Sequence, residues 1–401
     1  MTDSTVSPSS APALRPTSGR RFSTFDLTVI GVVLALLSLI VLISLWEERV
    51  HGGAGVAYLA PAYGGVQNLW FVPIDNPAGA QQLTDSPNGL YDFGVSPDGK
   101  YIAFSERQEP SGLNEIKLLN LQTRQITQLT NCVQEDSDCR APRFQPQGQI
   151  IAYERMTMNS DLRQQGVGLG AIRVWVLDLR TQPYQTRPLA DNSQFIGHSP
   201  LWSLDGNSIA FYSSDIANPG IMIYNFAGQD EKSLKFVPSQ YGTVGTLSPD
   251  GTRLVFPDLT RRGESIYSYL RIADLGALEF LNLTDPTAPI DDTDAKWSPD
   301  GQSVVIARRY TDERYTRGYQ LYQLDLTTQS EQGLVVDERY SHGFFEFNQA
   351  GDQLTLQRFP LVSDSGDMLA DSRPQIWLKS LSTGELSLLA DNAFHPRWVN
   401  R

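Results

Sequence analysis

The tetrapeptide Ser96-Pro97-Asp98-Gly99 recurs unchanged at 248–251 and 298–301 of this 401-residue chain. Three related turns end at Gly148, Gly206 and Gly351, so the turn returns at intervals of roughly 50 residues. Proline presets φ at the second turn position, and glycine accepts the left-handed conformation that closes a tight hairpin. We therefore expect each copy to join two antiparallel strands.

Apolar residues flank every copy of the turn at fixed distances. Those four residues before the final glycine are Val95, Phe144, Trp202, Leu247, Trp297 and Phe347, and those five residues after it are Phe104, Tyr153, Phe211, Phe256, Ile306 and Leu356. They mark strands A and B of a repeating unit, and apolar stretches such as 116–119, 174–177 and 221–224 mark a third strand, C, which a fourth, D, follows. Four short strands per repeat indicate the blades of a β-propeller, because one sheet cannot bury both faces whereas a ring of sheets can.

The two ends of the repeat region supply complementary parts of one more blade. Residues 56–58, 69–72 and 82–84 have the pattern of strands B, C and D without a strand A, and 396–399 has the pattern of a lone strand A. Pairing between them would close the ring and remove two open sheet edges. We therefore predict an all-β, seven-bladed β-propeller over residues 56–401, with six blades as the alternative.

These repeats resemble the WD40-like (PD40) repeats of the TolB-like propeller proteins, which also occur in the propellers of prolyl oligopeptidase-type enzymes. The resemblance covers residues 56–401 and implies the fold. Its implication for function is broad, because such propellers serve as binding platforms, substrate gates and occasionally enzymes. The chain departs from TolB itself in having no room for the N-terminal α/β domain through which TolB engages partners, and in having seven blades rather than six.

The segment 27–46 is a run of twenty residues without a charge, bounded by Asp26 and Glu47. A helix of about 20 residues at about 1.5 Å per residue spans the hydrocarbon core of a bilayer, about 30 Å. Three arginines, Arg15, Arg20 and Arg21, precede it, so the positive-inside rule places the N-terminus in the cytoplasm. We predict a disordered cytoplasmic tail (1–25), a single-pass transmembrane helix (26–47), a linker (48–55) and a propeller outside the cytoplasm, in a periplasm or in the extracellular space.

The charge of the chain restricts its possible partners, and its cysteines indicate the compartment in which it folds. The formal net charge is −13, which makes nucleic acid an unsuitable partner. The two cysteines are Cys132 and Cys139, in the expected loop before strand A of the second complete repeat. Redox-active pairs are more often CxxC, and a zinc site needs two further ligands nearby; neither feature is present. Outside the cytoplasm a disulfide between them is expected.

The connections from strand B to C and from D to A are longer and more varied than the A-to-B turns, so binding is expected on their side of the ring. The long segments are 156–172, 257–267, 308–318 and 359–374. Candidate binding residues near the mouth of the central channel are His198, His342 and His395, each just before a strand A, together with Asp92 and Asp294. The two aspartates share the register of His395, three residues before the apolar position of strand A.

Two functions are compatible with these residues. We favour a membrane-tethered, extracytoplasmic binding or scaffold module for a protein, peptide or envelope glycan, without a cofactor. The alternative is a metal-assisted lyase or hydrolase at the channel mouth, because histidines and carboxylates bind divalent metals or act as acid and base. Oligogalacturonate lyase, a seven-bladed TolB-like ring with a metal held by channel histidines, resembles this second arrangement. Convergence of the five residues would favour the enzyme, and scatter would favour the binding module. No G-x-S-x-G nucleophile motif occurs.

Overall fold

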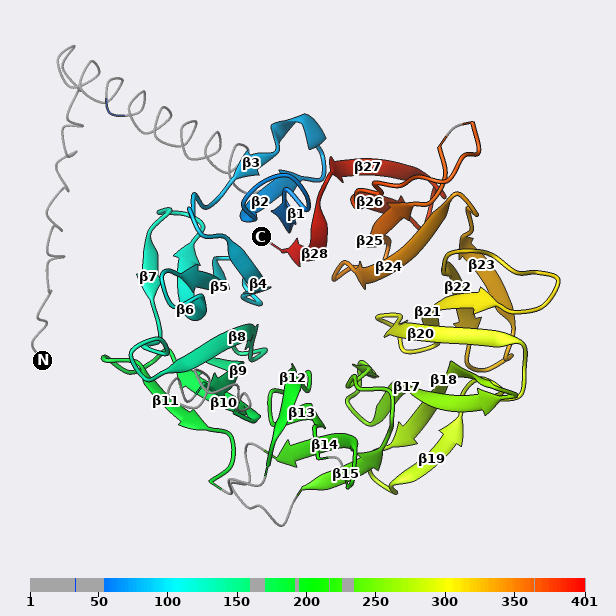
Figure 1. Cartoon of the computed structure of the whole chain (residues 1–401), viewed down its shortest axis with the longest axis horizontal. Helices are drawn as coiled ribbons and strands as arrows, with labels where there is room; N and C mark the ends of the chain where they lie inside the picture. The colour runs from blue at the N-terminus through cyan, green and yellow to red at the C-terminus, as the bar shows by residue number, and fades with distance from the viewer. Residues whose placement is uncertain are drawn as a thin grey trace, which may run out of the picture. The chain divides into compact units, whose positions relative to one another are not determined.

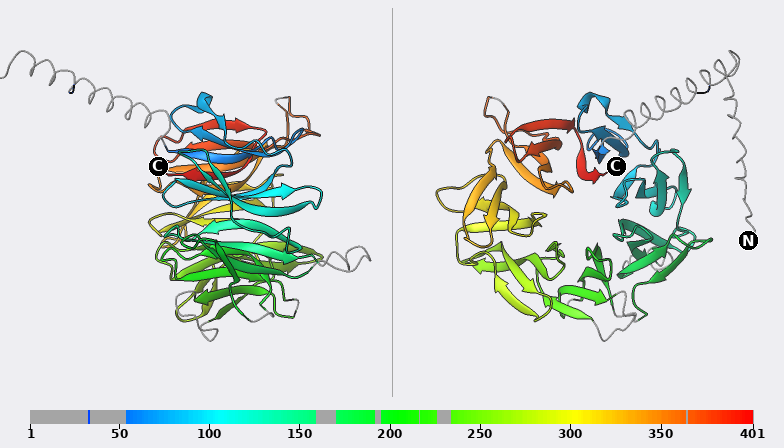
Figure 2. Two further views of the ribbon diagram at one scale, coloured as in Figure 1. Left: turned by 90° about the vertical axis from the view of Figure 1, so that its left-hand side faces the viewer. Right: turned by 180° about the vertical axis from the view of Figure 1, so that it is seen from behind.

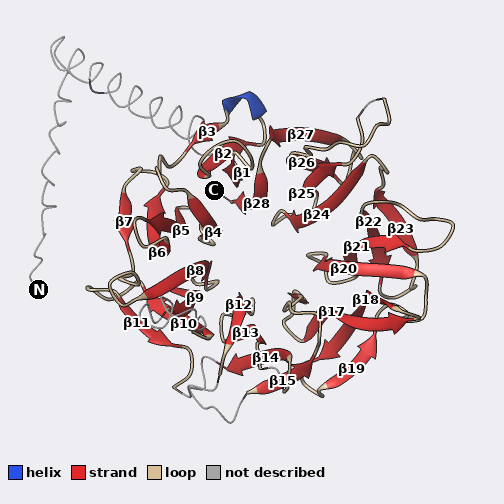
Figure 3. Cartoon of the chain, in the orientation of Figure 1, coloured by secondary structure: helices blue, strands red, loops and turns tan. Residues whose placement is uncertain are grey.

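The computed structural model describes Val33 and residues 54–158, 170–191, 195–215, 217–225, 234–363 and 365–400. The described residues from 54 onward form seven four-stranded antiparallel sheets arranged in a ring (Figures 1 and 3). The seven-bladed prediction is confirmed, and the six-bladed alternative is wrong. The predicted tail and membrane anchor lie, except for Val33, outside the described residues. Within the described part, no helix is both long and apolar enough to cross a bilayer.

Each of the first three blades is a consecutive set of four strands that runs outward from the channel (Figure 1). Blade 1 comprises β4 (Leu90–Val95), β5 (Tyr101–Gln108), β6 (Leu113–Asn120) and β7 (Ile126–Gln128). Blade 2 comprises β8 (Ser137–Phe144), β9 (Ile150–Thr157), β10 (Ile172–Asp178) and β11 (Gln185–Pro188). Blade 3 comprises β12 (Gly197–Trp202), β13 (Ser208–Ser213), β14 (Gly220–Asn225) and β15 (Lys235–Pro238).

The next three blades repeat this order. Blade 4 comprises β16 (Thr246–Leu247), β17 (Arg253–Arg262), β18 (Ser265–Asp274) and β19 (Glu279–Asn282). Blade 5 comprises β20 (Ile290–Trp297), β21 (Ser303–Tyr310), β22 (Gln320–Asp325) and β23 (Glu331–Val335). Blade 6 comprises β24 (Tyr340–Phe347), β25 (Gln353–Pro360), β26 (Gln375–Ser380) and β27 (Leu386–Asp391).

Blade 7 joins the two ends of the propeller, as the sequence predicts. The C-terminal strand β28 (Phe394–Val399) pairs antiparallel with β1 (Gly55–Ala60), which is followed by β2 (Asn68–Pro73) and β3 (Gln81–Gln82). Val56 lies opposite Trp398, and Gly55 lies opposite Val399. Figure 2 shows from behind that the C-terminus lies at the inner side of this blade. The inner edge of β1 is therefore covered by β28 and not left open.

The repeated turns behave as their sequence predicts. Gly99, Gly251 and Gly301 adopt φ values of 64°, 70° and 70°, the left-handed region that glycine favours. In the first turn the Ser96 hydroxyl donates to Asp98 at 2.7 Å and accepts from the Tyr101 amide at 2.9 Å. These bonds fix the hairpin between strands A and B. We call the side of the ring that carries these turns the turn face, and the side where the inner strands begin the loop face.

Tryptophans of the inner strands connect neighbouring blades. The indole N–H of Trp202 donates to the Arg143 carbonyl at 3.1 Å, in the preceding blade. Trp297 donates in the same way to the Thr246 carbonyl at 3.2 Å, and Trp398 to the Glu346 carbonyl at 2.9 Å. All three tryptophans are buried. Each therefore buries a large apolar surface while its one polar group is paired across the blade boundary.

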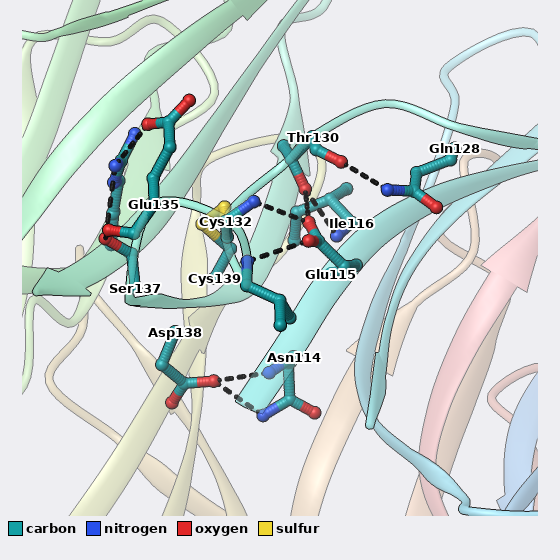
Figure 4. Close-up of a disulfide and its surroundings, with 12 residues drawn as sticks. Asn114, Glu115, Ile116, Gln128, Thr130, Cys132, Glu135, Ser137, Asp138 and Cys139 are labelled. Carbon is teal, nitrogen blue, oxygen red and sulfur yellow. Dashed lines mark hydrogen bonds and ion pairs between the residues drawn. A yellow bond between two sulfur atoms is a disulfide. The ribbon is translucent and has the colours of Figure 1, made fainter. Parts of the chain in front are cut away.

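The disulfide between Cys132 and Cys139 is present (Figure 4). Cys139 lies in strand β8, so the prediction that both cysteines occupy the preceding loop is wrong for this residue. Glu115 of β6 accepts hydrogen bonds from the amides of Cys132 and Val133, each at 2.8 Å. These bonds tie the start of the cross-linked segment to blade 1, as Figure 4 shows.

One long segment expected to be an irregular loop is regular structure. Residues 257–262 belong to β17 and residues 265–267 to β18, ten-residue strands that pair as far as Arg262 opposite Ser265. Gly263 has a φ of 63° and closes the hairpin in two residues. The sequence 261–264 is polar, which suggests a loop, but exposed strands at the end of a hairpin tolerate the same polar side chains.

Candidate functional site

A cavity of about 910 Å³ occupies the central channel, and residues of all seven inner strands or their leading segments line it. Every blade contributes the residue three positions before the apolar position of strand A. These residues are Asp92, Ala141, Ser199, Val244, Asp294, Phe344 and His395. Because the blades share one register, a single position of the repeat encircles the cavity. We call this set the first ring.

The backbone is irregular at four residues of the first ring. Ala141, Ser199, Phe344 and His395 have φ values of 51°, 58°, 46° and 54°, and the strand pairing shifts register beside each of them. Such bulges re-aim side chains and are common beside functional sites. In blades 1 and 5 the aspartate itself accepts the next amide: Asp92 from Phe93 at 2.6 Å, and Asp294 from Ala295 at 2.8 Å.

The five residues predicted from sequence separate into two groups. Asp92, Asp294 and His395 line the cavity, whereas His198 and His342 do not. His198 precedes the first ring by one residue; its ring lies 5.5 Å from that of Tyr212 and its Nδ1 lies 2.9 Å from the Ser199 hydroxyl. All three histidines lie within inner strands, not in the connections before them as predicted. The difference arises because these strands extend beyond their apolar residues to the bulge and past it.

His342 is part of the protein interior. It is buried, and its Nδ1 donates to the Tyr319 carbonyl at 2.9 Å. Burial lowers the pKa of His342 to about 4; the Tyr319 hydrogen bond and Asp337 oppose this change, and Arg358 reinforces it. The neutral imidazole is therefore the form that fits the folded protein at neutral pH.

Acid should weaken the fold through this histidine. The unfolded chain protonates His342 near pH 6.5, whereas the folded chain does so near pH 4, so stability falls as pH decreases through that window. We expect His342 to account for a loss of about 2 kcal/mol in unfolding free energy between pH 7 and pH 5. Urea unfolding at both pH values should give a smaller difference for His342→Gln than for the unaltered protein. Equal differences would contradict this assignment.

A second ring of residues lies two positions after the first. It comprises Gly94, Arg143, Leu201, Thr246, Lys296, Glu346 and Arg397. Four of these, Arg143, Leu201, Lys296 and Arg397, line the same cavity. The sequence prediction missed the three cations. Strand alternation is a signal that would have found them, because residues two apart in a strand face the same side.

Arg143 joins blades 1 and 2 inside the cavity. Its guanidinium lies 2.9 Å from the Asp92 carboxylate and donates to the Phe93 carbonyl at 3.1 Å and the Pro142 carbonyl at 2.9 Å. Glycine at position 94 lets the backbones of blades 1 and 2 come this close together, because a Cβ on Gly94 would lie 2.4 Å from the Pro142 carbonyl oxygen. Burial alone would raise the pKa of Asp92, but the positive charges of Arg143 and Arg397 outweigh it and hold that pKa below its usual value.

His395 and Phe344 form an aromatic part of the wall. Their ring centroids lie 4.9 Å apart, and the ring centroid of Phe394 also lies 4.9 Å from that of the histidine. Burial lowers the pKa of His395, and the charges of Arg397 and Arg143 lower it further, whereas Asp92 raises it. The imidazole is therefore neutral at pH 7 and offers both a donor and an acceptor to a ligand.

The described residues include no group of three or more His, Cys, Asp or Glu side chains positioned to hold a metal ion. The carboxylate of Asp92, a predicted ligand, is paired with Arg143 instead. The arrangement that would favour a metal-assisted enzyme is thus not formed by the five predicted residues.

Solved structures share this fold at low sequence identity. The propeller domain of the Trilobed protease from Pyrococcus furiosus has 15% identity and a TM-score of 0.56, with 85% of this chain and 95% of that chain covered. An oligogalacturonate lyase in complex with manganese has 16% identity and a TM-score of 0.56, with 82% and 84% covered. TolB from Acinetobacter baumannii has 15% identity and a TM-score of 0.46, with 86% and 82% covered.

No protein-family profile and no curated protein sequence matches the chain. At these identities the structural likeness concerns the fold and not the activity. The chain is a seven-bladed β-propeller, and its fold is similar to those of the Trilobed protease propeller domain and of the oligogalacturonate lyase.

Proposed function

We propose that this chain is a binding module that holds a segment of a protein or peptide partner in its central channel, entered from the loop face. The observation that carries the proposal is the cavity of about 910 Å³ with its ring of one residue from every blade. Pockets of about 300–1,000 Å³ are typical of ligand sites. Tyr91 and Phe344 line it with 53% of their surface exposed, and exposed aromatic residues dominate many binding interfaces.

We also propose that the propeller is tethered to a membrane by residues 26–47 and lies outside the cytoplasm. The uncharged run 27–46 and the arginines before it support this topology. The Cys132–Cys139 disulfide is a further support, because such bonds persist in oxidising compartments and are rare in the cytosol. The partner would then be a component of the cell envelope or its surroundings.

Photo-cross-linking in intact cells tests the proposed function. A benzophenone amino acid at Phe344 should give a discrete covalent adduct with a protein or peptide, and the same residue at Lys100 on the turn face should give none. An adduct that resists protease and is lost on glycosidase treatment would overturn the assignment to a protein in favour of an envelope glycan. Equal adducts from both positions, or none from Phe344, would overturn the channel as the binding site.

The same cells report on the topology. Residues 1–25 contain no lysine, whereas the propeller contains exposed ones such as Lys100. A membrane-impermeant amine reagent should therefore label the protein in intact cells, and labelling only after lysis would contradict the extracytoplasmic location.

A further inference from the structure

Arg397 differs from the other two cations of the cavity in its contacts. Arg143 is paired with Asp92, and the Lys296 ammonium lies 3.9 Å from the Asp294 carboxylate. Among the described residues, none forms a hydrogen bond or ion pair with the Arg397 guanidinium. An arginine stays charged in proteins, so the cavity contains a cation without a contact partner.

The surroundings of Arg397 leave room for an added anion. Burial lowers the pKa of Arg397 and Arg143 lowers it further, whereas Glu346, Asp92 and Asp294 act in the opposite direction without reaching contact distance. Withdrawing a charge from water is costly unless a counter-charge comes within hydrogen-bonding distance. A carboxylate is the anion whose planar geometry matches the paired donors of a guanidinium.

The main chain beside the cavity favours a peptide as the carrier of that carboxylate. The inner strand of blade 4 comprises only Thr246–Leu247, whereas the other six inner strands have six or eight residues. Residues 243–245 precede it, line the cavity and lie outside its pairing with β17. Thr243 is exposed, whereas Val244 is buried. Main-chain amides and carbonyls outside strand pairing can bind an extended peptide, because they are available as donors and acceptors.

We infer that the cavity binds the C-terminal end of a peptide, with its terminal carboxylate on Arg397 and its last side chains against Phe344 and Tyr91. This inference rests on the proposed binding function of the channel and specifies its ligand. The neutral His395, whose ring contacts those of Phe344 and Phe394, lines the same cavity and would lie beside this ligand. An aspartate or glutamate within an internal segment could place a carboxylate on Arg397 as well, and peptides that differ only in their terminal group distinguish the two sources.

Matched peptide pools test this inference on the full-length chain in detergent micelles. One pool of heptapeptides, random at every position, ends in free carboxylates, and the other contains the same sequences as C-terminal amides. Mass spectrometry of the peptides retained by the immobilised protein should show about ten-fold enrichment of carboxylate over amide forms, given the strength of charge-assisted hydrogen bonds. Arg397→Gln should reduce that ratio to about one, whereas Lys100→Gln on the turn face should leave it unchanged.

The variants separate failure of this inference from failure of the proposed function. Arg397→Lys keeps the charge without the planar fork, and it should retain part of the preference if Arg397→Gln misfolds. Equal retention of both pools, with Phe344 cross-links intact, would overturn the carboxylate inference and leave the binding function standing. Enrichment that survives both substitutions in a folded protein would overturn the role of Arg397.

Discussion

A chain that ends at Ala393 is expected to lose the cooperative melting transition of the propeller. This truncation removes β28, the inner strand of blade 7 and the partner of β1. It exposes the backbone edge of β1 and the apolar cluster that includes Val56, Tyr58 and Ile376. Each side chain withdrawn from that core costs about 1.5–3 kcal/mol, and several are lost together. Differential scanning calorimetry should show a broadened or absent transition, with aggregation through the open edges.

The matched control for this truncation is a chain that ends at Asn400, which keeps every residue of β28. It should melt like the unaltered protein. Trp398→Ala is expected to be intermediate, because it keeps the strand pairing but removes a buried indole and its hydrogen bond to the Glu346 carbonyl. A cooperative transition at the original temperature for the chain ending at Ala393 would show that β28 does not hold the ring closed.

The second large effect is expected at a buried ion pair between Asp292 and Arg308. The Arg308 Nε lies 2.7 Å from Asp292 Oδ1, and its Nη2 lies 2.9 Å from Oδ2. The Asp292 side chain is 0% exposed and that of Arg308 is 8% exposed, and Arg308 also pairs with Glu331. Removing one member of a buried pair typically costs about 3–5 kcal/mol, because the other charge remains buried without a partner. We therefore expect Arg308→Ala, which leaves the buried Asp292 carboxylate without its counter-charge, to lower the unfolding free energy by that amount, as measured in urea.

Comparison with an exposed pair isolates the effect of burial. Arg314 and Asp312 form a similar pair at 2.6 Å with side chains 55% and 29% exposed, and Arg314→Ala should destabilise the protein far less than Arg308→Ala. The double variant Asp292→Ala/Arg308→Ala should be less destabilised than the sum of its two single variants. Additive losses would show that the two side chains contribute independently of each other.

The fold is predictable from this sequence because each turn glycine closes the same kind of hairpin between strands A and B. The left-handed glycine and the apolar residues at fixed distances from it specify strands A and B without long-range information. Blade 7 is predictable because its two parts have complementary strand patterns. Where local signals conflict, prediction fails: the polar residues 261–264 suggest a loop, although the neighbouring strands continue to Arg262 and from Ser265.

The candidate site is only partly predictable because the bulges decide which side chains reach the cavity. Three of the five predicted residues share the first-ring register and line it, whereas His198 and His342 lie one and two positions earlier. A one-residue offset in a strand turns the side chain of His198 to the opposite face, and the register shift between Gly343 and Glu346 lies between His342 and the following residues of its strand. Arg397 was missed because an isolated arginine in a strand belongs to no motif. Only its position two residues after the first ring marks it, and that ring is recognised only when seven distant segments meet.

The ring of equivalent positions has a consequence for how a ligand is oriented. Because the seven blades have nearly the same backbone, the backbone alone would let a ligand that enters along the channel axis bind in any of seven rotational orientations. The side chains remove this degeneracy, because Arg397 of blade 7 and Arg143 of blade 2 flank blade 1, where Asp92 lies. An arc of three adjacent blades thus differs in charge pattern from the rest of the circle. A bound segment would be selected not only for entering the channel but also for its angle of rotation within it.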